Sequence, residues 1–127
     1  MPSQDPGPHL LDILEHIALV RAWIDGMTLE EFARDLRTRY AVQMAFLIMG
    51  EAAEALPPEL RQRHPDVPWR GLADIANTVR HRDWAVEHRI TWTGLENELA
   101  PLEDAARAEL ARLGGSPSRP GAPGNGA

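Results

Sequence analysis

Apolar residues recur every three or four positions along most of this chain, and no other feature limits its fold as strongly. That spacing puts the apolar side chains on one face of an α-helix, whereas a half-buried strand would need an alternation of period two, which no segment shows. The pattern runs through about 8–25, 38–55, 69–84 and 86–110. We therefore expect an all-α bundle of four or five helices, with short connections that make neighbouring helices antiparallel.

Capping residues and prolines mark the ends of the expected helices. Thr28 and Glu31 form a capping box that opens a short helix over 29–36. The two prolines at 57–58 end the most apolar segment, which is expected to be the central buried helix. Pro101 either kinks the last helical segment or restarts it as a second helix, and both alternatives stay open.

The composition is that of one soluble globular domain with a tail. Of the 127 residues, 43% are hydrophobic and 25% charged, which suffices for one small core. We place the domain at 8–113, whereas 114–127 can bury nothing and should be a disordered tail. The chain has no cysteine, so disulfides and a thiol nucleophile are excluded. No apolar run reaches the roughly 18 residues that cross a bilayer, and a cytoplasmic protein is expected.

The charge is distributed unevenly along the chain. The formal net charge is −6, but residues 61–89 carry six Arg and three His against four acids. A locally basic segment in an acidic protein can present itself to a phosphate-bearing partner. A solvated helix face has the same composition, so both interpretations stay open.

Helix geometry places four polar side chains of this basic segment on one exposed stripe, opposite the apolar face of the helix expected over 69–84. They are Arg70, Asp74, Asn77 and His81. Arg80 and Arg82 flank His81. An imidazole can move protons near neutral pH and a guanidinium can stabilise a phosphorane, so the stripe suits metal-free phosphodiester cleavage. A polar stripe opposite an apolar face is also what any surface helix shows.

Other polar residues favour structural roles. Glu51 and Glu54 lie near the C-terminal end of the central helix, where the helix dipole disfavours negative charge, and Arg39 or Tyr40 could be their polar partner. The sequence has no His-Glu-x-x-His motif and no pair of histidines four apart, so neither a metal nor another cofactor is expected.

Three ordered motifs carry a family resemblance. They are Met49-Gly-Glu-Ala-Ala-Glu-Ala-Leu-Pro-Pro-Glu-Leu60, His64-Pro-Asp-Val-Pro-Trp69 and Ile75-Ala-Asn-Thr-Val-Arg-His81. Over about 9–110 the chain resembles the HepT-like proteins of the HEPN superfamily. The resemblance implies an all-α HEPN fold and a homodimer in which two motif helices meet across a cleft. It also implies a toxin that cleaves RNA without a metal and is restrained by a nucleotidyltransferase antitoxin of the MNT type.

The chain departs from the family motif at two positions. That motif is Arg, then a polar residue that is often Asn, a few apolar residues, His, and a Tyr two positions after the His. Asn77 and His81 match it, but Ala76 stands in the Arg position and Asp83 in the Tyr position. Arg80, one turn beyond Ala76, is a candidate replacement for the missing Arg. Asp83 offers no hydroxyl for the adenylylation by which the partner inactivates such toxins.

Two interpretations follow from the resemblance. In the first, the chain is a ribonuclease toxin in which His81 transfers protons, Asn77 orients it or the phosphate, and Arg80 stabilises charge. Four further residues would contact RNA or a partner. These are Arg70, Asp74, Arg82 and Asp83. In the second, the chain is a catalytically decayed HEPN protein that acts as the dimeric, partner-binding subunit of an MNT complex.

Overall fold

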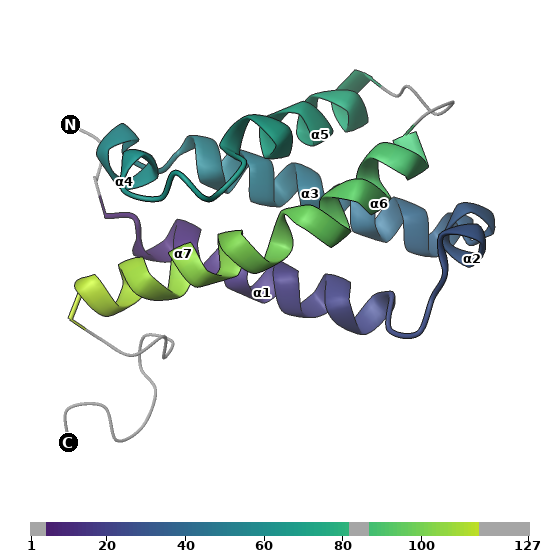
Figure 1. The fold of residues 1–127 in the computed structure, drawn as a ribbon, viewed down its shortest axis with the longest axis horizontal. Coiled ribbons are helices and arrows are strands. Elements are labelled where there is room, and N and C mark those ends of the chain that lie inside the picture. Colours follow the sequence, from purple (N-terminus) through teal and green to yellow (C-terminus); the bar gives the residue numbers. More distant parts are fainter. Residues whose placement is uncertain (1–4, 82–86, 115–127) are drawn as a thin grey trace.

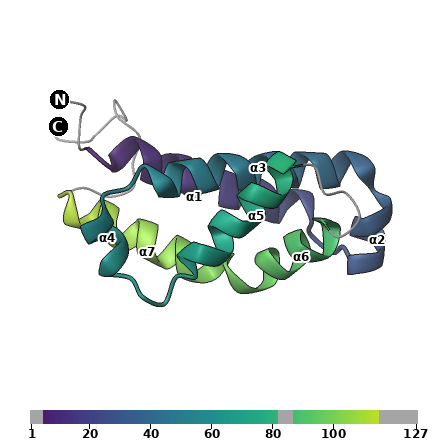
Figure 2. The same cartoon turned by 90° about the horizontal axis from the view of Figure 1, so that it is seen from above.

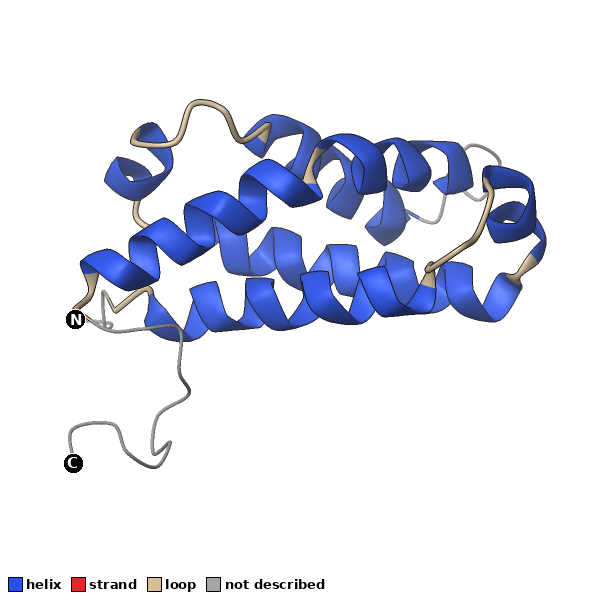
Figure 3. Cartoon of the chain, turned by 60° about the horizontal axis from the view of Figure 1, so that its bottom comes forward, coloured by secondary structure: helices blue, strands red, loops and turns tan. Residues whose placement is uncertain are grey.

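The computed structural model describes residues 5–81 and 87–114, and within them it contains seven α-helices and no strand (Figures 1 and 3). The five long helices are α1 (Gly7–Trp23), α3 (Leu36–Glu54), α5 (Trp69–His81), α6 (Glu87–Asn97) and α7 (Leu99–Arg112). Two short ones, α2 (Leu29–Arg34) and α4 (Pro58–Gln62), lie in the connections. The predicted all-α bundle of four or five helices is therefore confirmed.

The long helices form an antiparallel bundle (Figures 1 and 2), and their buried side chains make one hydrophobic core. Helices α1, α3 and α5 run alternately in opposite directions, and α6 and α7 follow one another as a single interrupted rod. Helix α3 packs against both α1 and α5, α5 packs against α6, and α7 closes the ring against α1. None of the helices in the described ranges is long and apolar enough to cross a lipid bilayer.

The apolar face of each helix lines the core. Phe46 and Met49 of α3 and Ile13 and Val20 of α1 have no exposed surface, and Leu72 of α5 is almost fully buried. Burying a side chain of this size stabilises the fold by about 1.5–3 kcal/mol. The prediction that α3 is the central buried helix is confirmed.

Two side-chain caps fix the turn between α1 and α3. The hydroxyl of Thr28 accepts from the backbone N–H of Glu31 at 3.1 Å, and the Glu31 carboxylate accepts from the N–H of Thr28 at 2.9 Å, so the predicted capping box is confirmed. The carboxylate of Asp35 accepts from the N–H and the hydroxyl of Thr38, which ends α2 at Arg34 and starts α3 two residues before the predicted position. These bonds lower the pKa of Asp35.

The last segment is two helices, and Pro101 is the third residue of the second one. The first backbone N–H groups of a helix have no acceptor within it, so the proline ring removes no hydrogen bond there. The interruption lies at Glu98, whose own N–H still donates to the carbonyl of Gly94. Pro101 therefore restarts the helix rather than kinking it.

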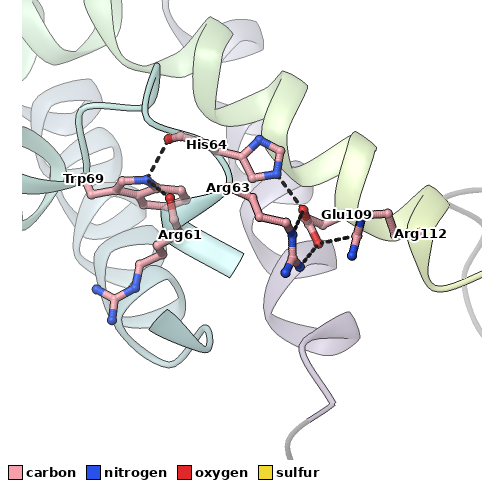
Figure 4. Close-up of polar contacts among 6 residues, drawn as sticks. All are labelled: Arg61, Arg63, His64, Trp69, Glu109 and Arg112. Atoms are coloured by element: carbon pink, nitrogen blue, oxygen red, sulfur yellow. Dashed lines mark hydrogen bonds and ion pairs between the residues drawn. The ribbon is translucent and has the colours of Figure 1, made fainter. Parts of the chain in front are cut away.

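Glu109 of α7 anchors the segment that leads from α4 to α5 (Figure 4). Its side chain is only 4% exposed. Arg63 donates to both carboxylate oxygens, at 3.1 and 2.6 Å, and His64 Nε2 donates to Oε2 at 2.6 Å. Trp69 adds a second anchor, because its indole N–H donates to the backbone carbonyls of Arg61 and His64. The bond from Arg63, with help from His64, holds the pKa of Glu109 below its ordinary value.

Replacing Glu109 by Gln should lower the free energy of unfolding by about 1–3 kcal/mol at about pH 7, because Arg63 loses a charged acceptor. The pKa of Glu109 is lower in the folded protein than in the unfolded chain, so the carboxylate stabilises the fold fully at any pH above its unfolded-state pKa. This stabilisation is lost as the pH falls through the folded-state pKa. Urea unfolding should therefore show the difference between the two proteins shrinking in acid. Asp104→Asn, an exposed charge removal on the same helix, should change stability by less than about 0.5 kcal/mol. Equal losses in both variants would contradict this role for Glu109.

Candidate functional site

Helix α5 brings four of the predicted site residues onto one exposed face. Its inner side is fixed by Leu72 and Ile75, which are buried against the core. The four side chains that point away from the core are all exposed. They are Arg70, Asp74, Asn77 and His81, which we call the α5 stripe.

His81 is the last residue of α5 and has a defined ring orientation. Its Nδ1 lies 2.9 Å from the backbone carbonyl of Asn77, one turn earlier. A carbonyl oxygen can only accept, so Nδ1 carries the hydrogen and donates it. In the neutral imidazole, Nε2 is then the nitrogen with a free lone pair, on an exposed side chain. This is the arrangement that a proton-accepting histidine requires.

Arg80 lies on the side of α5 that faces α3. Its Nη2 is 3.7 Å from Glu51 Oε2 and 4.0 Å from Glu54 Oε1. Arg80 is thus a charged partner of both acids, and its side chain reaches them because α3 and α5 pack against each other. Arg39, one of the partners expected from the sequence, instead donates to the backbone carbonyl of Ala33 at 3.0 Å, so that prediction was wrong.

Ala76 occupies the position of the family arginine, and it is buried. Only 2% of its surface is exposed. A Cβ added to Gly50 of α3 would lie 2.7 Å from the Cβ of Ala76. The two helices therefore approach so closely that neither position accepts a larger side chain unless the backbones move apart.

The remaining predicted residues are not placed by the structure. Arg82 and Asp83 lie outside the described residues, as does the end of the helix expected over 69–84. His88, one of the three histidines of the basic segment 61–89, belongs to α6, which begins at Glu87.

A cavity of about 320 Å³ opens beside the α5 stripe, between α5 and α6. Asp74 belongs both to the stripe and to the wall of this cavity. The complete wall consists of Gly71, Asp74, Ile75, Arg89, Ile90, Thr93, Gly94 and Glu98.

Glu98 is the functional candidate that the sequence analysis missed. It is 9% exposed, and its Oε1 has no hydrogen-bond partner among the described residues. Burial, followed by the negative charge of Asp74, raises its pKa to about 7. The sequence did hold a signal, since Glu98 lies three residues after Leu95 and four before Leu102, on the apolar face of its segment.

Comparison with known proteins agrees with the family resemblance. A family model described as ribonuclease HepT-like matches residues 13–109. A protein of Methanocaldococcus jannaschii named "Putative RNase" is 31% identical over 99 residues, which cover 78% of this chain and 82% of that protein. The "Probable ribonuclease HepT" of Thermococcus cleftensis is 30% identical over 95 residues, covering 75% and 86% of the two chains. No solved structure gives a significant match. Because the family model spans most of the helical domain and the relatives align over most of their length, this chain belongs to the ribonuclease HepT-like family.

Proposed function

We propose that this chain is the endoribonuclease toxin of a toxin–antitoxin module and cleaves RNA without a metal ion in the cleft of a homodimer. The observation that carries the proposal is His81, an exposed imidazole whose Nδ1 is occupied by a backbone carbonyl and whose Nε2 can accept a proton. Membership of the ribonuclease HepT-like family supports it.

The proposed reaction uses the RNA's own 2′-hydroxyl as the nucleophile. His81 Nε2 takes the proton from that hydroxyl, and the oxygen forms a bond to the adjacent phosphorus. The bond from phosphorus to the 5′ oxygen then breaks, and the imidazolium returns the proton to that oxygen. The products are a 2′,3′-cyclic phosphate and a 5′-hydroxyl, so no water or cofactor is consumed.

Two neighbours of His81 complete the proposed site. Asn77 holds the imidazole through its carbonyl and presents its side-chain amide on the same exposed face. Arg80 supplies positive charge for the phosphorane. Its pairs with Glu51 and Glu54 are long and solvent-exposed, and such pairs contribute only about 0–1 kcal/mol, so a phosphate can displace the carboxylates.

The proposed dimer is built through the exposed face of α5. A single helix offers a convex surface, whereas two copies related by a two-fold axis enclose a cleft between their α5 stripes. We further propose a cytoplasmic antitoxin of the MNT nucleotidyltransferase type as partner. It would cover Arg70, Arg80 and Arg82, since Asp83 has no hydroxyl to be adenylylated.

A second function is favoured by the contact between Ala76 and Gly50. The position of the family's arginine is filled by a small buried side chain. In this alternative the chain keeps the HEPN fold as the partner-binding subunit of an MNT complex and has lost catalysis.

The purified protein should cut single-stranded RNA in the presence of EDTA, and His81→Ala should abolish the cut. Arg80→Ala should slow it by up to about a hundredfold, the effect of losing one charge-stabilising group. His16→Ala is the matched control, because His16 makes the same contact to a carbonyl one turn earlier, on α1. Cleavage is followed by gel electrophoresis of labelled RNA. If the wild type and His81→Ala are equally inactive on several RNAs, and expression of neither slows growth, the non-catalytic alternative replaces the enzymatic proposal.

Sedimentation at micromolar concentration should reveal a species of twice the 14.1 kDa chain mass. Asn77→Arg should shift it toward the monomer, because two added cations would face each other across the two-fold axis. Asn97→Arg, which adds the same charge at the exposed end of α6, should leave the dimer intact. A wild type that sediments only as a monomer would exclude the composite cleft.

A further inference from the structure

We propose that the cavity between α5 and α6 is a nucleobase subsite that receives a guanine of single-stranded RNA, with Glu98 as the residue that recognises it. The inference rests on the proposed function, because it assigns part of the RNA to a surface next to the α5 stripe. Nothing in the proposed cleavage chemistry uses Glu98.

The walls of the cavity suit a flat aromatic ring. Ile75 of α5 and Ile90 of α6 supply apolar surface, and Gly71 and Gly94 line the cavity without a side chain. At Gly71 the missing side chain matters directly, since a Cβ there would lie 2.5 Å from Oε2 of Glu98. The volume of about 320 Å³ accommodates a ring of this kind.

Glu98 supplies the polar end of the cavity. More than nine-tenths of its surface is buried, yet its Oε1 accepts no hydrogen bond in the described part of the chain. Buried polar atoms nearly always have a hydrogen-bond partner. An unpaired carboxylate oxygen on a cavity wall therefore indicates that a bound ligand supplies the hydrogen-bond donor. The raised pKa of this carboxyl is consistent with an acid that lacks a cationic partner and sits near Asp74.

Guanine is the base whose edge fits a carboxylate best. An ionised carboxylate only accepts hydrogen bonds, and it has two oxygens side by side. Guanine presents two adjacent donors, N1–H and the N2 amino group. Adenine and cytosine place a ring acceptor beside their amino group, and uracil flanks its single N–H with carbonyls. Arg89 on the same wall has the side chain that pairs with guanine O6 and N7.

The position of the cavity fixes where the guanine would lie on the RNA. Asp74 precedes His81 by seven residues, which is about 10 Å along the helix axis. Stacked nucleotides are spaced by about 3.4 Å, so the bound guanine would lie about two or three nucleotides from the bond that is cut.

Binding of labelled RNA tests the inference independently of cleavage. The probes are a short oligouridine that carries one guanosine and the same oligonucleotide with adenosine in its place, titrated against the His81→Ala protein by fluorescence anisotropy. At about pH 8, where the carboxyl of Glu98 is ionised, we expect the guanosine probe to bind about tenfold more tightly, as for one hydrogen bond to a charged group. Adding Glu98→Gln should remove that preference, because the amide turns an N–H toward a donor of guanine. Adding Glu96→Gln, which changes an exposed acid two residues earlier in the chain, should preserve it.

Two further measurements protect the test against misfolding. Glu98→Gln keeps the side-chain size. The raised folded-state pKa of Glu98 means that its protonation favours the folded protein. The free energy of unfolding of the wild type should therefore rise relative to that of the variant as the pH falls from about 8 to about 5. Asp74 and Arg89 are the charged groups that share the cavity wall with Glu98. Gly71→Ala places a methyl group against the carboxylate and should also abolish the preference.

The outcomes separate this inference from the proposed function. Cleavage that depends on His81 without a guanosine preference would overturn the subsite and leave the ribonuclease standing. A preference that depends on Glu98 in a protein that never cuts RNA would support the subsite together with the non-catalytic alternative. If Glu98→Gln changes the sedimentation of the dimer and not the base preference, a side chain of a second copy fills the cavity, and the nucleobase assignment is wrong.

Discussion

The contact between Gly50 and Ala76 fixes how α5 lies on the bundle, and the candidate site depends on it. Only a glycine at position 50 lets the Cβ of Ala76 come this close to α3. With that side of α5 held against α3, helix geometry turns Asn77 and His81 outward and leaves Gly71 facing Glu98, at the junction of α6 and α7. The contact takes no part in the proposed chemistry, but it sets the rotation of α5, the helix that carries the candidate site residues.

That rotation gives α5 two different flanks. On one flank Nη2 of Arg80 lies 3.7 and 4.0 Å from the acids near the end of α3, so Glu51 and Glu54 compete with a phosphate for this guanidinium. On the other flank the buried Glu98 stands near Asp74 and has no such cation paired with it in the described residues. An RNA strand that follows the α5 stripe would thus have Arg80, already paired with two acids, on one side. On its other side it would have the carboxyl groups of Glu98 and Asp74, which can accept hydrogen bonds. The first arrangement suits a phosphate, and the second suits the edge of a base.

The sequence predicted which face of α5 is buried and where α2 begins, although α2 ends and α3 begins two residues earlier than expected. The spacing of Leu72 and Ile75 predicted which way His81 faces, and Thr28 with Glu31 predicted the start of α2. Features that depend on two helices could not be predicted. The partner of Glu51 follows from where α3 ends beside α5, and the cavity at Glu98 exists because Gly71 leaves space across an interface. The roles of Arg82 and Asp83 stay predictions, since both lie outside the described residues.

The same packing bears on the loss of the family's arginine. A guanidinium at position 76 would start from a Cβ that is pressed against Gly50, so it would have to push α3 and α5 apart or bend around the interface. Arg80, one turn later, starts from the exposed edge and needs no such space. An arginine at position 80 instead of 76 avoids a steric clash between α3 and α5. However, it also pairs the positive charge near His81 with the acids of α3. Any catalysis by this chain would then depend on RNA phosphates competing with Glu51 and Glu54, a requirement that an arginine at the motif position would not impose.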